Sequence, residues 1–418
     1  MSEVIYDVAI VGGGLAGMNA AIRCEELGLR SVILEASDQL GGKLRTDRDE
    51  EGFLYDRGFQ VCFTAYDEIP NGARNFFARD SEWMLFSPGA TIAGLGTLSK
   101  WNFVRSLGCR ALSPFDLIKL LLLNQKSGNW ESYRSTQNVA DFLEDFGFSS
   151  KAIQKFFAPF YGGISLDRGL RGSSKQFLKT WFYLSKGKTA TLRGGIVELP
   201  MAMSFAYGLG DTKRGPTVMT ESRVTGFTKG EEYYSLVTTE PLKARSLILA
   251  GGPKSGESLL NRDFEVDFKQ STCLYFASGK PVTREKYIVL NPASNALVNQ
   301  LVPLSNVNRA CAPKGKHLCS ATIIGDRPES DEELAQMAID EMNTWGINLP
   351  PLEFKRAYRI KEAQLCQEPG FEDRVPSIKT HLPGVFLAGE ITTSSSINDA
   401  LKSGRLAAEA ALAYLKNK

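Results

Sequence analysis

The segment Tyr6–Gly17 has the sequence YDVAIVGGGLAG, a short apolar run followed directly by three glycines. The run Tyr6–Val11 is rich in β-branched residues and predicts a buried parallel strand. We expect a helix over Leu15–Leu27 and a second strand over Ser31–Leu34. Together these elements form one βαβ unit of about 30 residues, the usual size for this motif.

The glycines of this segment have the spacing of a dinucleotide-binding turn. Gly12 permits the tight turn from strand to helix, Gly14 lets a pyrophosphate approach the backbone, and Gly17 lets the helix lie close to the strand. The first helical residues, Leu15 and Ala16, then present unpaired amides and the positive end of the helix dipole to the phosphates. The sequence therefore predicts a dinucleotide site here.

Glu35 ends the second strand, eighteen residues after Gly17. A carboxylate at this distance accepts hydrogen bonds from the ribose hydroxyls of an adenine dinucleotide, and it repels a 2′-phosphate. The alternative to a dinucleotide site is a glycine-rich turn beside a surface glutamate, with no bound nucleotide. The motif alone does not distinguish FAD from NAD.

The composition is that of an ordinary globular protein of two to three domains. The chain has 418 residues, 43% of them hydrophobic, and its 49 Lys and Arg against 47 Asp and Glu give a net charge of +2. We therefore expect no nucleic-acid partner. Two histidines, and seven cysteines without a CxxC pair, predict no metal site and a reducing, cytoplasmic compartment. Neither a signal peptide nor a membrane-spanning segment is expected.

The rest of the chain divides by its pattern. From Asn71 to about Lys188 the pattern is mainly helical, and strand patterns return after Gly195. The expected helices are 114–125, 139–146, 150–160, 174–184, a capped helix 330–345 and a last helix 397–415. The expected strands are a hairpin made by 217–228 and 233–239, a strand 245–250, several short strands within 273–324, and a strand 384–388.

Residues after the second strand resemble the flavin-containing amine oxidase superfamily, which includes monoamine oxidases, protoporphyrinogen oxidases and phytoene-desaturase-like enzymes. The similar positions are Glu35-Ala36, Gly41-Gly42-Lys43 and Asp56-Arg57-Gly58. Lys43 stands where the family usually has arginine, so a cation remains but the bidentate fork is lost. The resemblance implies that Ala36, Gly42, Lys43, Gly58 and Phe59 contact the cofactor.

The resemblance continues in later parts of the chain. Gly389-Glu390 is similar to the family's second flavin motif, and the helix beginning near Ile397 to its last helix, whose amides would face the flavin pyrimidine. A capped terminal helix with an alanine-rich packing face is the structural alternative. Val224 corresponds to a strand that presents its backbone to the adenine. The implied fold is α/β, with a Rossmann-like FAD-binding domain around a parallel sheet (1–85, 190–265 and 376–418) and a mixed α+β substrate domain formed by insertions (86–189 and 266–375).

The implied function is an FAD-dependent oxidoreductase that transfers a hydride from a small or apolar organic substrate to flavin N5. No cysteine lies in Thr392–Ser396, so we expect noncovalent FAD. No side chain is assigned a catalytic role. Substrate contacts considered are Phe177, Trp181, Phe182, Tyr183 and Tyr358, and the lysines considered near N5 are Lys361 and Lys402. The alternatives are a non-catalytic flavin-binding or redox-sensing protein, and an NAD-dependent dehydrogenase, which the second flavin motif disfavours.

The stretch Trp101–Leu123 combines aromatic, basic and leucine residues. It fits either a buried helix of the substrate domain, which we favour, or a helix lying at a membrane surface. The protein is therefore expected in the cytoplasm, with peripheral membrane contact as the alternative. The sequence does not predict the oligomeric state.

Overall fold

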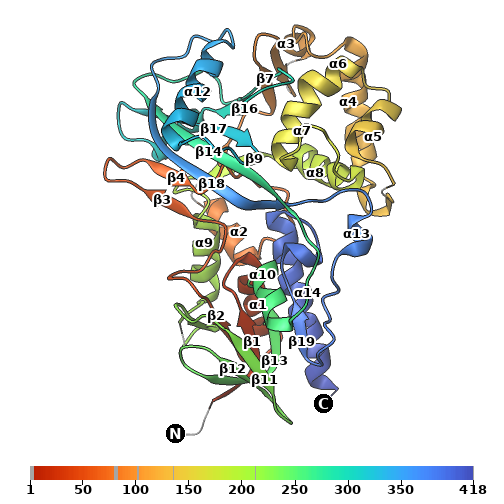
Figure 1. Ribbon diagram of the computed structural model, residues 1–418, viewed down its shortest axis with the longest axis vertical. Coiled ribbons are helices and arrows are strands. Elements are labelled where there is room, and N and C mark those ends of the chain that lie inside the picture. The colour runs from red at the N-terminus through yellow and green to blue at the C-terminus, as the bar shows by residue number, and fades with distance from the viewer. Residues whose placement is uncertain (1–3, 80–82, 101–102, 135, 212, 418) are drawn as a thin grey trace.

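The computed structural model describes residues 4–79, 83–100, 103–134, 136–211 and 213–417. The chain forms two lobes, each built around a large sheet (Figure 1). The first sheet and both ends of the described chain lie in the lower lobe, and the second sheet with a group of helices makes the upper lobe.

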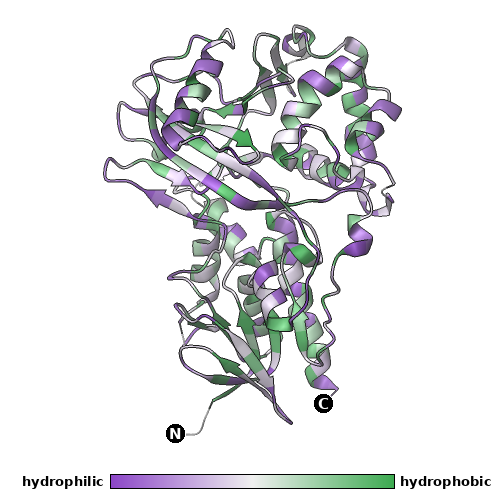
Figure 2. Cartoon of the chain, in the orientation of Figure 1, coloured by the Kyte–Doolittle hydropathy of each residue, from purple (hydrophilic) through white to green (hydrophobic). Residues whose placement is uncertain are grey.

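The first sheet has a parallel centre that begins with the expected βαβ unit. Strand β1 pairs in parallel with β2 and β13, and β13 pairs in parallel with β19. Apolar residues dominate these central strands, which are green in Figure 2. The strands are β1 (Ile5–Val11), β2 (Ser31–Leu34), β10 (Thr217–Met219), β11 (Gly226–Lys229), β12 (Tyr234–Val237), β13 (Leu242–Leu249) and β19 (Val385–Leu387).

Helix α1 (Leu15–Glu26) and the last helix, α14 (Ile397–Lys416), pack against each other on this sheet. Small residues allow the close approach, because a Cβ at Gly404 would lie 2.0 Å from the carbonyl oxygen of Ala16. A Cβ at Gly17 would lie 1.9 Å from the Gly12 oxygen, so Gly17 brings α1 onto β1 as the sequence predicts. The two ends of the chain therefore meet beside the glycine turn.

The second sheet has the strand order β18-β14-β17-β16-β15-β7-β8. Two long strands, β14 and β18, pair in antiparallel fashion along most of their length. The strands are β7 (Gly89–Ile92), β8 (Gly96–Ser99), β14 (Phe268–Ser278), β15 (Ile288–Leu290), β16 (Val298–Val302), β17 (His317–Ile324) and β18 (Glu353–Leu365). Two small sheets complete the strands: β3 (Thr46–Arg48) with β4 (Leu54–Asp56), and β5 (Cys62–Phe63), β9 (Thr189–Leu192) and β6 (Trp83–Leu85).

The remaining helices cover these sheets. In the upper lobe they are α3 (Phe103–Leu107), α4 (Pro114–Ser127), α5 (Val139–Asp145), α6 (Ser150–Ala152), α7 (Ala158–Ser165), α8 (Ser174–Lys186), α11 (Leu304–Val307) and α12 (Asp331–Asn343). The others are α2 (Asn71–Arg79), α9 (Glu198–Tyr207), α10 (Pro253–Leu260) and α13 (Phe371–Arg374). Single turns occur at η1 (Trp130–Ser132), η2 (Ile153–Phe157), η3 (Arg309–Cys311) and η4 (Glu390–Thr392).

Most expected elements are confirmed, including the capping box of Ser330 and Glu333 on α12. Two predictions were partly wrong. The helix expected over 150–160 contains the π-turn η2. The hairpin expected from 217–228 and 233–239 is instead β11 with β12, while Thr217–Met219 joins β2 as a separate parallel strand. Glu221, at φ +52°, breaks the extended run between them.

These observations confirm the predicted fold class, an α/β protein with a Rossmann-like parallel sheet and a mixed second region. The exact boundaries of the two domains stay a prediction.

Candidate functional site

One large cavity, of about 1340 Å³, extends from the glycine turn of the lower lobe to the helices of the upper lobe. Most of the residues that the sequence places at the cofactor line it. These are Gly12, Gly14, Leu15, Ala16, Glu35, Gly42, Lys43, Gly58, Phe59, Gly389, Glu390 and Ile397. Gly17 lies behind the wall in its packing role, Ala36 is exposed outside the cavity and Val224 is buried in the core. Cofactor contacts by all of these residues stay predictions.

The glycine turn forms a cradle in which side chains have no room. Gly12 has φ +105°, and a Cβ there would lie 2.7 Å from the backbone of Ala250. A second turn faces it, because a Cβ at Gly42 would lie 2.9 Å from the Cα of Gly14. Gly14 caps helix α1 without a side-chain hydrogen bond, so no capping side chain covers the first amides of that helix. This end of the cavity suits a pyrophosphate.

Glu35 is held at the cavity wall by short hydrogen bonds. Its Oε2 accepts from the Gly13 amide at 2.6 Å, and its Oε1 accepts from the amide and hydroxyl of Ser37 at 2.8 and 2.6 Å. These contacts fix the direction of the carboxylate. Arg45, which the sequence analysis did not single out, donates to the same Ser37 hydroxyl at 2.6 Å and also lines the cavity.

The two flavin-type motifs meet through an ion pair. Lys43 Nζ lies 2.5 Å from Glu390 Oε1, although the residues are 347 positions apart. The Ser395 hydroxyl donates to the other Glu390 oxygen at 2.6 Å. Glu390 thus compensates the charge of Lys43, the residue that replaces the family's usual arginine.

A second ion pair, which the sequence analysis missed, lies at the start of α14. The Asp399 carboxylate accepts from the hydroxyls of Ser394 and Ser396 at 2.5 and 2.6 Å, and Lys179 of α8 also donates to it. The side chains of Lys179 and Asp399 are only 12% and 3% exposed. Asp399 lies in the first turn of the last helix, but no local pattern indicates its partner.

The floor of the cavity is one face of the second sheet. Alternate residues of β14, namely Lys269, Ser271 and Cys273, line it, as the two-residue period of a strand requires. Cross-strand neighbours extend this face into a single row in which every member lines the cavity: Tyr358, Cys273, Thr322, Gln300 and Leu290.

The Asp56–Phe59 segment lies over one end of this floor. A Cβ at Gly58 would lie 2.5 Å from Ile360 of β18, and the Tyr275 hydroxyl donates to the Asp56 carbonyl at 2.7 Å. The Asp56 carboxylate accepts from the Thr46 hydroxyl at 2.6 Å and from the Ile196 amide at 2.9 Å. Burial raises the pKa of Asp56 to about 6.

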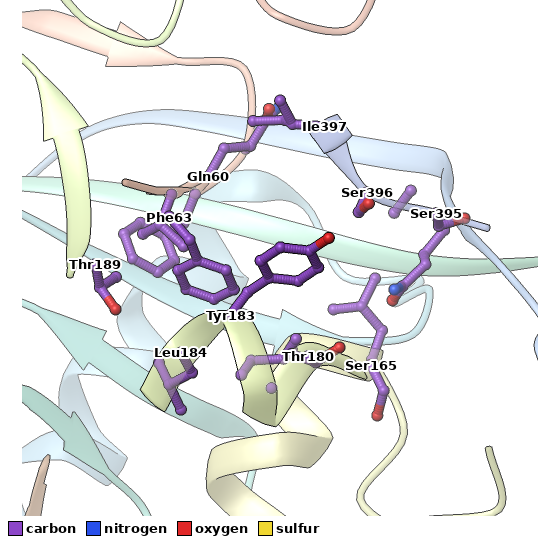
Figure 3. A pocket seen from close by; sticks show the side chains of 18 of the residues that line it. Gln60, Phe63, Ser165, Thr180, Tyr183, Leu184, Thr189, Ser395, Ser396 and Ile397 are labelled. Atoms are coloured by element: carbon purple, nitrogen blue, oxygen red, sulfur yellow. The ribbon is translucent and has the colours of Figure 1, made fainter. Parts of the chain in front are cut away.

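Helix α8 supplies much of the opposite wall. In Figure 3 the side chains of Thr180, Tyr183 and Leu184 project from this helix, and Phe63 lies beside Tyr183. Of the candidate aromatic contacts, Trp181, Tyr183 and Tyr358 line the cavity, whereas Phe177 and Phe182 do not. Of the two candidate lysines, Lys361 lines it and Lys402 does not.

The fold and this site define a nucleotide-cofactor oxidoreductase of the Rossmann type. The family model described as flavin containing amine oxidoreductase matches residues 15–412. The chain therefore belongs to the family of flavin containing amine oxidoreductases, as the sequence motifs indicated. It is a flavin-dependent oxidoreductase.

Individual relatives differ in how much of the chain they match. Protoporphyrinogen oxidase 2 of Arabidopsis thaliana is 21% identical, covering 98% of this chain and 94% of the relative. A 15-cis-phytoene desaturase of an Oncidium hybrid cultivar is 38% identical, but over only 30% of this chain and 21% of the relative. The solved structure of a putrescine oxidase with bound putrescine has a TM-score of 0.71 at 14% identity, and covers 98% of this chain and all of its own.

Within the part of the chain that the structure describes, no helix is both long and apolar enough to cross a bilayer.

Proposed function

We propose that the cavity binds FAD noncovalently and that the enzyme oxidises an apolar organic substrate by hydride transfer to the flavin. The observation that carries this proposal is the cavity itself, which joins a glycine cradle, the carboxylate of Glu35 held in a fixed direction, and a mainly apolar compartment. Its volume of about 1340 Å³ exceeds the usual range for a single small ligand, so a cofactor and a substrate fit together. When bound, the flavin supplies the hydride acceptor.

The residues of the chain hold and orient the two molecules. The amides at the start of α1 and the Gly42 turn would bind the pyrophosphate, and Glu35 would bind the ribose. The Gly58–Phe59 segment and the start of α14 would lie against the flavin ring. The floor of the second sheet would hold the substrate carbon opposite the ring and exclude water.

The chemistry of the cavity cysteine supports noncovalent binding. Among the described residues, Cys273 is the only cysteine that lines the cavity. Burial raises the pKa of its thiol to about 12, which keeps it protonated and poorly nucleophilic.

The charges of the cavity favour an apolar substrate over an amine. Its upper wall is made by aliphatic and aromatic side chains of the helices: Leu117, Leu120, Leu121, Phe156, Phe160, Trp181 and Leu184. The acidic residues of the wall, Glu35, Glu362, Glu390 and Asp399, already accept hydrogen bonds or ion pairs. An ammonium group would therefore meet mostly apolar surface and paired carboxylates, a costly environment for a charge.

The test begins with the purified protein. We expect an oxidised flavin spectrum, and FAD in the supernatant after acid precipitation. Anaerobic titration with polyenes or porphyrinogens should bleach the flavin, and titration with amines should not. Flavin retained in the precipitate would contradict noncovalent binding, bleaching by amines alone would contradict the substrate class, and protein purified without flavin would contradict the whole proposal.

A further inference from the structure

Gln300 is a polar side chain on the cavity floor, and the site described so far gives it no task. It lies on β16 in the cross-strand row, next to Leu290 on one side and Thr322 on the other. Only 6% of the residue is exposed, and it lines the cavity.

A chain of hydrogen bonds fixes which way its amide points. Arg168 has no acceptor atom, and its Nη1 donates to Asn299 Oδ1 at 3.0 Å. The Asn299 Nδ2 group must then face acceptors, and it donates to the Pro159 carbonyl at 3.0 Å and to Gln300 Oε1 at 2.5 Å. Gln300 Oε1 is thus turned toward Asn299, and its Nε2 is turned the other way.

The Nε2 group is available to a ligand. In the described residues no hydrogen bond uses Gln300 Nε2 as a donor, and it is absent from the polar atoms that are fully enclosed without a partner. The cavity is the open space next to this residue. The amide therefore presents its donor hydrogens to the contents of the cavity.

A glycine on the facing helix makes room for this arrangement. A Cβ at Gly163 of α7 would lie 2.3 Å from Gln300 Oε1 and 2.6 Å from Asn299 Nδ2. Any larger residue at position 163 would push the amide out of its place. Helix α7, Asn299 and Arg168 together hold the Gln300 Nε2 donor in one direction.

The position of Gln300 also separates it from the end of the floor that is proposed to face the flavin. Cys273 lies against the backbone of Phe59, at the end of the floor proposed to face the flavin. Gln300 is two strands away in the same row, through Thr322. Neighbouring strands are about 4.8 Å apart, so the backbone of Gln300 lies roughly 10 Å from that of Cys273.

We propose that Gln300 anchors the substrate by donating a hydrogen bond to a carbonyl or carboxylate oxygen in a part of the molecule remote from the carbon that is oxidised. The guanidinium of Arg168 behind Asn299 favours an oxygen acceptor and disfavours a cation at this point. The substrate is then an apolar molecule with one oxygen acceptor, rather than a pure hydrocarbon or an amine. This inference rests on the proposed function and narrows its substrate class.

The experiment measures binding of three twelve-carbon probes to the flavin-loaded protein, using tryptophan fluorescence and flavin absorbance. The probes are dodecanoate, methyl dodecanoate and dodecylamine, each kept below its micelle concentration. Loss of one hydrogen bond changes affinity about three- to tenfold. We expect Gln300→Leu to weaken binding of one or both oxygen probes by this factor and to leave dodecylamine unchanged. If the ester and the acid weaken equally, the carbonyl oxygen is recognised, and if only the acid weakens, the carboxylate is recognised.

Two further variants keep the test decisive if Gln300→Leu is unstable. Gln300→Glu replaces the donor by an acceptor and should shift the preference from dodecanoate toward dodecylamine. Gly163→Ala should reproduce the selective loss by displacing the amide. The matched control is Gln336→Leu, the same change on the exposed face of α12, which should alter no affinity.

The contrary outcomes are separable. No binding of the oxygen probes to the wild-type protein, or an equal change for all three probes in the Gln300 variants, would overturn the role of Gln300 while the flavin content stays full. Absence of bound flavin in the wild-type protein would instead overturn the proposed function.

Discussion

At the scale of single residues, Glu35 is the side chain proposed to recognise the nucleotide ribose. Three protein donors hold its carboxylate in a fixed direction at the cavity wall. Hydrogen bonds to a charged acceptor contribute about 1.5–3 kcal/mol. We predict that Glu35→Ala weakens FAD binding about tenfold or more, measured by fluorescence titration of the apoprotein. The exposed Glu25→Ala variant is the control, and an unchanged FAD affinity in Glu35→Ala would refute the assignment.

Asp56 is a partly buried residue whose carboxyl ties the hairpin β3–β4 to the turn before α9. Burial raises its pKa from 3.8 to about 6, so the folded protein binds a proton that the unfolded chain has released. Stability from this group is therefore present below pH 4 and is lost as the pH rises through 6.

We predict that Asp56→Asn removes this dependence, because the amide stays neutral. The difference in unfolding free energy between the variant and the wild type should therefore shift in favour of the variant by up to about 3 kcal/mol from pH 4 to pH 7. This figure follows from the raised pKa at about 1.4 kcal/mol per pKa unit. Denaturant unfolding across this pH range measures the difference. Asp38→Asn, at a side chain that is 74% exposed, is the control, and parallel pH profiles for wild type and Asp56→Asn would contradict the prediction.

At the scale of elements, α4 is apolar on two faces. Leu117 and Leu120 line the cavity, while Phe115, Ile118 and Leu122 are 73%, 54% and 50% exposed. The prediction of a buried helix in this stretch is therefore only partly correct, because one face of α4 is exposed. Leu121 does both, since it lines the cavity and is 66% exposed.

We propose that this exposed face touches a membrane surface, so that an apolar substrate passes from lipid into the cavity beside Leu121. The basic residues Arg105, Arg110 and Lys126 are exposed close to it in the chain and favour anionic lipid.

The prediction concerns vesicles of phosphatidylcholine and phosphatidylglycerol. Phe115→Ser combined with Leu122→Ser should lower the vesicle partition coefficient at least about tenfold, because each buried apolar side chain contributes about 1.5–3 kcal/mol. Cosedimentation measures this. Phe205→Ser on α9 is the matched control, since Phe205 is 71% exposed far along the chain from α4. Equal losses in the control, or no binding by the wild type, would contradict the proposal.

At the scale of the whole molecule, the Lys179–Asp399 pair joins the helical part of the upper lobe to the last helix of the lower lobe. Removing one partner of a buried pair leaves the other charge uncompensated, which costs about 3–5 kcal/mol. The two serine hydroxyls that remain on Asp399 place the expected loss for Lys179→Met at the lower end, about 3 kcal/mol.

Chemical denaturation measures this loss, and a double-mutant cycle with Asp399→Asn tests its origin. The double variant should be more stable than Lys179→Met alone, because no buried charge remains unpaired. The exposed Lys186→Met, on the same helix, should change little. If the two single losses simply add, the residues do not act as a pair.

The sequence by itself determined the βαβ unit, the dinucleotide turn and the family. Strand, glycines, helix and Glu35 follow one another within about 30 residues, where hydrophobic period and turn geometry act locally. The last helix could be predicted for the same reason, from Ile397 and its capping residues. Most of the residues at this end of the cavity wall could be predicted from these motifs.

Only the tertiary structure decided which distant residues meet. Lys43 forms an ion pair with Glu390, and Lys179 forms one with Asp399. Arg168 orients Gln300 through Asn299. The same holds for the two faces of α4 and for Thr217–Met219 leaving the expected hairpin. A local pattern states that a side chain is buried or exposed, but which group it contacts depends on how separate elements pack, and that is set by the three-dimensional fold.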